Sequence, residues 1–171
     1  SGKIKCFKTD EYGKEYVNDI YARGSFVGVM SLLAGDDYHE SALAMEECEV
    51  AVIPQQDFLS LVDSNRDVKN QFIKMLAGNV VEREKRLLEL AYTPVRERVA
   101  CVLLSLKSKM VLSDSNELKI SREDLACMVG TAKESLIRNL SEFKKDGVIE
   151  TEGQLIVIKN LKQLEQIAKG S

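Results

Sequence analysis

Two helix-start signatures stand ten residues apart near the C-terminal end, and they restrict the fold more than any other feature. Ser121 precedes Asp124 by three residues, and Thr131 precedes Glu134 by the same step. A hydroxyl residue followed three positions later by an acid is typical of a capping box, which satisfies free N–H groups at a helix start. Gly130 lies between the two signatures, where a left-handed backbone ends a helix sharply. The spacing therefore predicts two short helices joined by a tight turn.

The two predicted helices have apolar faces and are followed by a hairpin. Their apolar positions are Leu125, Ala126 and Val129 in the first helix and Leu136, Leu140 and Phe143 in the second. Residues 146–150 and 154–158 flank Gly153 and predict two short strands, a hairpin of the kind called a wing. A small helix is expected over residues 160–170. Two helices joined by a tight turn form a helix-turn-helix, whose second helix is free to enter a DNA major groove.

The N-terminal half has the alternating pattern of β-strands. Residues 3–8 and 15–22 are joined by a turn that contains Gly13, so they predict a β-hairpin. Residues 41–54 alternate in the same way and predict further strand structure. The period then changes, and residues 57–62 predict a short helix.

A long helical pattern without proline runs from Arg66 to Ala91. Its apolar stripe has steps of three and four residues, the spacing of a coiled coil, and one arginine interrupts it. A helix of about 26 residues is roughly 39 Å long, which is long for a helix packed only on its own small domain. We therefore favour pairing with a second copy over packing within one chain. The expected dimer interface is Phe72, Leu76, Val80, Arg83, Leu87 and Leu90.

Pro94 marks the end of this helix, because proline suits the first turn of a new helix and disfavours helix at the residue before it. The next elements expected are an amphipathic helix over 95–109, a polar turn over 113–117 and a short strand over 118–120. The chain is then expected to have three parts, namely a β-rich domain over 1–64, a dimerisation helix over 65–92 and a DNA-binding domain over 93–171.

The stretch ISREDLACMVGTAKESLIRNLSEFKKDGVIE, residues 120–150, resembles the winged helix-turn-helix domain of the catabolite activator (CRP/FNR) family of bacterial transcription regulators. The order of the upstream elements resembles that family too. The resemblance implies an α+β fold with a jelly-roll β-barrel of the cyclic-nucleotide-binding type, a long dimerisation helix and a C-terminal winged helix-turn-helix. Because family members begin with several more strands, we expect a partial barrel in an N-terminally incomplete chain.

The resemblance also implies which residues contact DNA. The groove-facing residues would be Lys133, Glu134, Ser135 and Arg138, and the phosphate contacts would be Ser121, Arg122 and Thr131. An arginine can donate two hydrogen bonds to guanine, and a glutamate can accept one from cytosine. Two alternatives stay open. Glu134 could serve only in the capping box, and Lys144 and Lys145 could be phosphate contacts or a solvated helix end.

The charge distribution favours a DNA-binding C-terminal half only weakly. The net charge is −3, of which residues 1–94 carry −5 and residues 95–171 carry +2. Between Ser121 and Gly147 the charges balance, so binding to DNA of random sequence should be weak and salt-sensitive. Specific affinity would then require two copies acting together, as a homodimer on a near-palindromic double-stranded site. RNA polymerase is a further expected partner of such a regulator.

The segment that matches the family's cyclic-nucleotide cassette lacks the residues that hold the nucleotide. In nucleotide-binding members a Gly-Glu pair binds the ribose, and a later Arg-Ser pair holds the cyclic phosphate. The matching positions here are Gly28, Val29, Glu40 and Ser41. Val29 cannot accept a hydrogen bond from a ribose hydroxyl, and Glu40 would repel a phosphate where a guanidinium should bind it. We therefore expect a degenerate pocket, with neither cyclic AMP nor another cofactor bound.

Catalytic and metal-binding functions find little support in the sequence. The cysteines Cys6, Cys48, Cys101 and Cys127 form no C-x-x-C pair, and His39 is the only histidine. No nucleophile–base pair or Gly-rich phosphate loop is visible, so we expect neither an enzyme nor a metal site. Without a membrane-length apolar run or a secretory signal, a cytoplasmic protein is expected. The alternative function is an effector-sensing or protein-docking module without its own DNA specificity.

Overall fold

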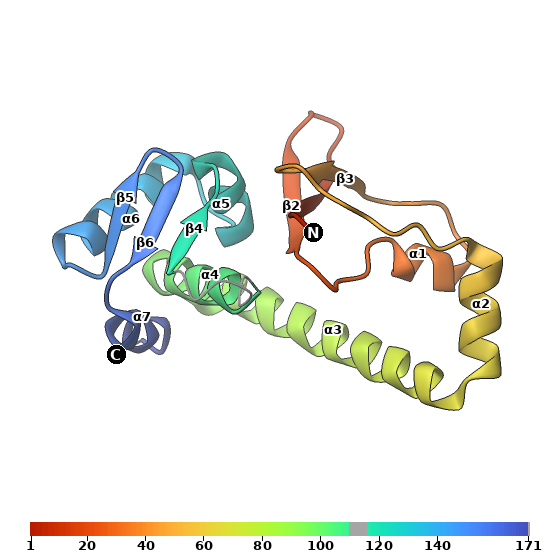
Figure 1. Cartoon of the computed structure of the whole chain (residues 1–171). Helices are drawn as coiled ribbons and strands as arrows, with labels where there is room; N and C mark the ends of the chain where they lie inside the picture. The colour runs from red at the N-terminus through yellow and green to blue at the C-terminus, as the bar shows by residue number, and fades with distance from the viewer. Residues whose placement is uncertain (110–115, 171) are drawn as a thin grey trace.

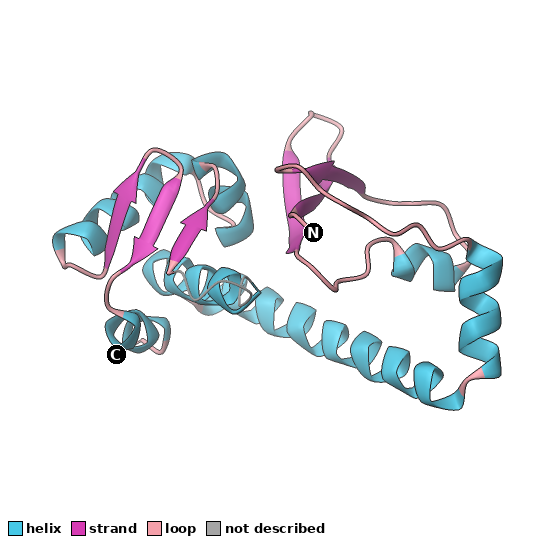
Figure 2. Ribbon diagram, in the orientation of Figure 1, coloured by secondary structure: helices cyan, strands magenta, loops and turns pink. Residues whose placement is uncertain are grey.

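The computed structural model describes residues 1–109 and 116–170 (Figure 1). The fold is α+β, with one small sheet in the N-terminal half, a second in the C-terminal part and a long helix between them (Figure 2). In chain order the elements are β1 (Ile4–Thr9), β2 (Glu15–Tyr21), α1 (Val29–Ala34), β3 (Ser41–Ala44), α2 (Gln55–Ser64), α3 (Arg66–Tyr92), α4 (Val95–Lys109), β4 (Glu117–Lys119), α5 (Arg122–Val129), α6 (Lys133–Lys145), β5 (Ile149–Glu152), β6 (Leu155–Ile158) and α7 (Leu161–Ala168). Within the described ranges, no helix has both the length and the apolar character needed to cross a membrane.

The N-terminal sheet is antiparallel with the strand order β2-β1-β3. The predicted hairpin is confirmed, and its register shifts by a bulge between Cys6 and Phe7. The strand predicted over 41–54 is wrong beyond Ala44, where β3 ends. An alternating sequence becomes a strand only where a neighbouring strand can pair with it, and within the segment 41–54 only residues 41–44 pair with β1. Val50 and Val52 in the unpaired segment are both exposed.

Helix α3 confirms the long helix expected from the sequence and extends it by one residue, to Tyr92. At its start, the Asn65 side chain accepts hydrogen bonds from the N–H groups of Asp67 and Val68. At its end, Thr93 is extended ahead of Pro94, as steric contact with a proline ring demands. No side chain of α3 is fully buried by the rest of the described chain, so the helix has free surface along its length.

In the C-terminal part, α4 and α6 pack against the antiparallel sheet β4-β6-β5, α5 packs on α4 and α6, and α7 packs on α4. The sheet contains the predicted wing strands, β5 and β6, and the short strand predicted over 118–120 is confirmed as β4. Its core includes Phe143, Leu103 and Leu136, none of which is accessible to solvent. The polar turn expected over 113–117 lies largely outside the described residues.

Candidate DNA-binding surface and effector pocket

The first helix of the helix-turn-helix, α5, is capped by Ser121 as predicted. The Ser121 hydroxyl accepts a hydrogen bond from the backbone N–H of Asp124 at 3.0 Å. The Asp124 carboxylate accepts a hydrogen bond from that same hydroxyl at 2.7 Å, rather than from the Ser121 backbone. Ser121 therefore lies at the start of α5, where free N–H groups and the helix dipole favour a phosphate.

The second predicted cap, Thr131, is wrong. Helix α6 has Ala132 at its N-cap, without a side-chain cap. Thr131 instead completes the end of α5, because its N–H donates to the carbonyl oxygen of Ala126 at 3.1 Å. Gly130 is left-handed, with φ of 69°, and its N–H donates to the carbonyl oxygen of Cys127 at 3.3 Å. These two bonds form a Schellman motif, which uses Thr131 to end one helix before the next begins.

The side chains expected to read bases lie in the first two turns of α6. Lys133, Glu134 and Arg138 are exposed, and Ser135 beside them is partly buried. Because Ala132 has no side-chain oxygen, Glu134 has no reciprocal capping box to complete and is available to a base. The opposite face of α6 is buried in the core through Leu136, Leu140 and Phe143.

Two of the expected DNA contacts already have partners within the chain. Lys133 forms an ion pair with Glu123, and this hydrogen bond lowers the pKa of the Glu123 carboxyl. Arg122 donates from Nη2 to the carbonyl oxygen of Gly153 at 2.8 Å, which ties the start of α5 to the turn of the wing. Its other terminal nitrogen, Nη1, is buried without a hydrogen-bond partner among the described residues. Burial lowers the pKa of Arg122, against the raising effect of Glu123.

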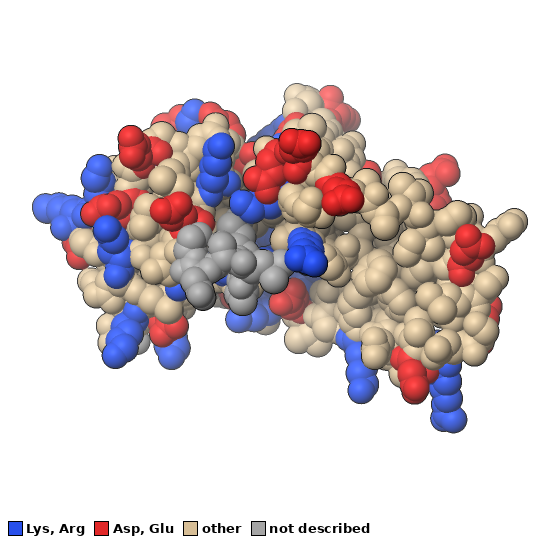
Figure 3. All heavy atoms as spheres, viewed as in Figure 1, with Lys and Arg blue, Asp and Glu red and all other residues tan. Residues whose placement is uncertain are grey.

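A hollow of about 230 Å³ lies between α6 and the wing, beside Arg122. Its lining residues are Arg122, Ile137, Leu140, Ser141, Lys144 and Thr151. The two cations and the Thr151 hydroxyl can donate hydrogen bonds to a phosphate oxygen, whereas the Ser141 hydroxyl donates to the carbonyl oxygen of Ile137 at 2.8 Å. From the sequence, Lys144 could be a phosphate contact or part of a solvated helix end. In the structure Lys144 lines this hollow. Figure 3 shows Lys and Arg side chains around the C-terminal part, at the left of the view.

Two family models match the chain. Residues 1–65 match the cyclic nucleotide-binding domain, and residues 97–167 match the Crp-like helix-turn-helix domain. The order of these two matches is the order of the two folded parts on either side of α3. The chain belongs to the CRP/FNR family of transcription regulators.

Relatives of this CRP/FNR regulator are similar over almost its whole length. It is 29% identical to the cyclic AMP receptor protein of Thermus thermophilus, over 99% of this chain and 77% of that protein. It is 26% identical to the fumarate and nitrate reduction regulatory protein of Escherichia coli, over 98% of this chain and 68% of that protein. A CRP/FNR-family regulator from Thermus thermophilus has a similar fold, with a TM-score of 0.80 at 22% identity, covering 99% of this chain and 84% of the other.

Two residues of the segment expected to hold an effector lie against other side chains of the regulator. Val29 is 8% exposed and packs in an apolar cluster with Phe58 and Val62. Gly28, with φ of 80°, lies under Tyr38, and a Cβ atom at Gly28 would stand 2.6 Å from Tyr38 Cε1. A side chain at position 29 in this arrangement points into the core between α1 and α2.

The two remaining residues of the expected cassette lie at the start of β3. Glu40 accepts a hydrogen bond from Asn18 Nδ2 at 2.7 Å, so its carboxylate faces β2. Ser41 is the first residue of β3 and is exposed. This region therefore presents a carboxylate, held in place by an amide, where a phosphate would need a cation.

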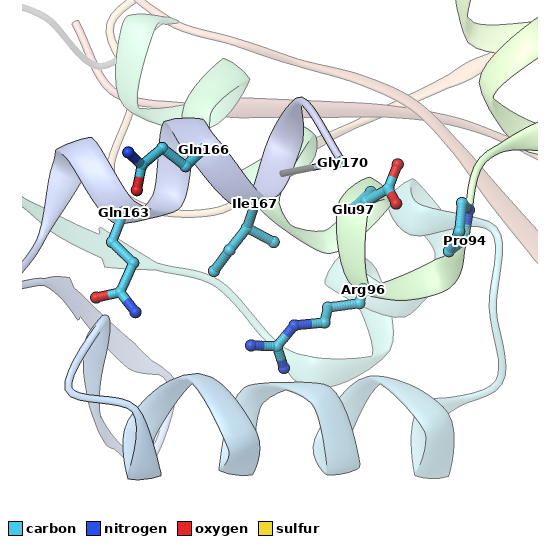
Figure 4. Close-up of a pocket in the computed structure, with 7 residues that line it drawn as sticks. All are labelled: Pro94, Arg96, Glu97, Gln163, Gln166, Ile167 and Gly170. Atoms are coloured by element: carbon cyan, nitrogen blue, oxygen red, sulfur yellow. The ribbon is translucent and has the colours of Figure 1, made fainter.

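A larger hollow of about 480 Å³ lies away from both expected sites, between α4 and α7 (Figure 4). Arg96 lines it, but the guanidinium pairs with Glu142 at 2.8 Å and Asp146 at 2.7 Å. Glu97 and Gln163 add a carboxylate and an amide. Among the described residues that line this hollow there is no unpaired cation for an anionic ligand, and none of them is a predicted site residue.

Some residues of the predicted dimer stripe on α3 are exposed, and others are covered by the same chain. Val80, Leu87 and Arg83 are exposed, whereas Leu76 is partly buried. Phe72 packs edge-to-face against Phe26 and Phe58, with ring centroids 5.4 and 5.1 Å apart. Leu90 lies against Gly130 of the helix-turn-helix. The large exposed hydrophobic residues of α3 that the stripe omitted are Ile73, Val81, Leu88 and Tyr92.

Proposed function

We propose that this chain acts as a homodimer that binds a near-palindromic DNA site and that its barrel does not take up cyclic AMP. The observation that carries the proposal is α6, whose N-terminal half presents Lys133, Glu134 and Arg138 to solvent while its other face is fixed in the core. Arg138 would donate to guanine O6 and N7, and Glu134 would accept from cytosine N4. Ser135 would face the groove beside them, and Ser121, Thr131 and the Arg122 hollow would hold the adjacent phosphates.

Pairing of two chains through α3 would align two such helices. Ile73, Val80 and Leu87 recur every seven residues, and Val81 and Leu88 form a second row beside them. All five are exposed in the single chain. Apolar side chains in a row this long on one helix favour a second copy of the same helix as the covering surface. The two recognition helices would then face successive major grooves.

The proposed loss of nucleotide binding is supported by the surroundings of Val29 and Glu40. A glutamate at position 29 could not point to a ribose without leaving the apolar cluster around Phe58. The Glu40 carboxylate would face the cyclic phosphate with the same sign of charge. We also propose the division into residues 1–64, 65–92 and 93–171, and RNA polymerase as a further partner.

Selection of bound duplexes from a randomised DNA pool tests the function directly. We expect the full-length protein to enrich a two-fold symmetric site equally well with and without cyclic AMP. Enrichment only with cyclic AMP would contradict the proposed loss of nucleotide binding. Enrichment of a single half-site would contradict the dimer, and no enrichment in either condition would favour a docking module without DNA specificity.

A further inference from the structure

Lys5 is a charged residue that the fold buries, with an exposed fraction of 6%. Its Nζ atom lies 2.8 Å from Glu15 Oε2 and 2.8 Å from Asp124 Oδ1. Glu15 belongs to the same β1–β2 hairpin, whereas Asp124 lies 119 positions later, in the first turn of α5. Burial alone lowers the pKa of Lys5. The hydrogen bonds and charges of Asp124 and Glu15 together raise it by more than burial lowers it, so the pKa of Lys5 lies above its usual value.

This ion pair joins the N-terminal sheet to the helix-turn-helix, with the Lys5 side chain buried, the Asp124 side chain 18% exposed and the Glu15 side chain 42% exposed. Such a pair contributes little net stability, because burial of the Lys5 ammonium costs hydration that its partners must offset, but it can select one arrangement of the parts it joins. Breaking it by removing one partner leaves the other charge without compensation. The contact is thus suited to fixing an orientation more than to holding the fold together.

Arg86 of α3 makes a second connection across the same boundary. Its Nη1 donates to the carbonyl oxygen of Asn18 at 3.0 Å, and its Nη2 donates to the carbonyl oxygen of Met128 at 2.9 Å. One guanidinium thereby joins the long helix, strand β2 and the last turn of α5. Val17 and Ile20 of β2 are buried in the same apolar cluster as the core of the helix-turn-helix. The hairpin is therefore docked on α5 by charge, hydrogen bonds and apolar burial together.

The docked hairpin leaves the DNA-reading side open. Lys133, Glu134 and Arg138 are all exposed on α6. Lys5 contacts one oxygen of Asp124, and the other oxygen of that carboxylate accepts the hydrogen bond from the Ser121 hydroxyl. The chain of contacts thus runs from the N-terminal sheet to the start of α5, while α6 stays free.

We propose that Lys5 and Arg86 are positioning residues that hold the helix-turn-helix in one orientation relative to α3, and that this docked arrangement is the one that binds DNA. The inference rests on the proposed function, because orientation matters only if two recognition helices must reach two half-sites at once. A fixed orientation raises the effective concentration of the second helix at its half-site. Affinity for a single half-site depends on the contacts of one helix-turn-helix and its wing, and not on the orientation of that helix-turn-helix relative to α3.

The test compares full-length wild type with the variants Lys5→Met and Arg86→Met. Lys8→Met is the matched control, since Lys8 lies on the same strand with its side chain exposed. Binding is measured to a duplex with two half-sites and, at low salt, to a duplex with one. Hydrogen exchange of the hairpin and α5 is measured without DNA.

We expect each variant to lose about 10- to 100-fold in affinity for the two-site duplex and little for the single half-site. Exchange should rise in the hairpin and α5 of both variants but not in the control.

Three outcomes would overturn the positioning role. Unchanged two-site affinity means that docking does not set orientation, and increased affinity means that docking restrains DNA binding. Equal losses of affinity on both duplexes mean a general structural defect and not a role in orientation. Lys5 and Arg86 contact different groups, so the same result in both variants cannot come from local damage at one position. If wild type shows no sequence preference, the proposed function fails, and hydrogen exchange still confirms or refutes the docking contact itself.

Discussion

Replacing Leu87 by aspartate should separate the proposed dimer into single chains. Leu87 is 68% exposed in the single chain, so a partner helix would cover about two-thirds of its surface. Full burial of a leucine side chain is worth roughly 1.5–3 kcal/mol, which gives about 1–2 kcal/mol per copy and about 2–4 kcal/mol for the two copies in a symmetric dimer. Loss of that energy raises the dissociation constant about 30- to 1000-fold. Two aspartates brought close to the two-fold axis would add repulsion to this loss.

Sedimentation equilibrium over a range of protein concentrations measures the dissociation constant. The matched control is Leu61→Asp, which makes the same chemical change at an exposed leucine on α2, outside the proposed interface. Circular dichroism should show that both variants keep their helices. A Leu87→Asp protein that dimerises as tightly as wild type would refute the assignment of this face of α3 to a second copy.

Three further predictions concern the turn, the recognition helix and the core. Gly130→Ala should destabilise the protein by about 1–2 kcal/mol in a denaturant titration, because φ is 69° there and the new Cβ would meet Leu90. Arg138→Ala should weaken specific binding by about 1–3 kcal/mol and relax the preference at one base position of the selected site, and an unchanged site would exclude it as a base reader. Burial raises the pKa of Tyr21 to about 12 and that of Cys6 to about 11. Because both values lie above those of the unfolded chain, the free energy of unfolding should fall as pH rises from about 9 to about 12, and a flat profile would contradict this.

Local sequence signals predicted the elements well where the stabilising partner lies within a few residues. Ser121 caps α5 as expected, because a hydroxyl at the N-cap needs only the backbone N–H three residues on. Thr131 looked equally suitable but ends the preceding helix. A Schellman motif uses the residue directly after its left-handed glycine, and Gly130 comes immediately before Thr131. An N-cap for α6 and the Schellman motif that ends α5 both required Thr131, and sequence spacing alone could not show which of the two would form.

The free face of α3, which we propose meets a second copy, could be predicted only in part. Apolar spacing marked Phe72 and Leu90 as readily as Val80, because periodicity does not show which side the same chain already covers. Phe72 is covered by aromatic rings from the segment before α1 and from α2, and Leu90 by the turn of the helix-turn-helix. The seven-residue step from Ile73 to Val80 was available in the sequence and would have moved the predicted stripe to the exposed face.

The division at Pro94 separates the chain in sequence but not in packing. Val17 and Ile20 precede Pro94 by many residues, yet they belong to the same core as the helix-turn-helix. Lys5 and Asp124 reinforce this contact across 119 positions, a separation at which composition and periodicity carry no information. A displacement of the β1–β2 hairpin therefore acts on α5 through direct contact, as well as through the backbone that leads from α3 into α4. Because packed interfaces shift between discrete arrangements more readily than they deform, the hairpin and α5 are expected to move as one unit.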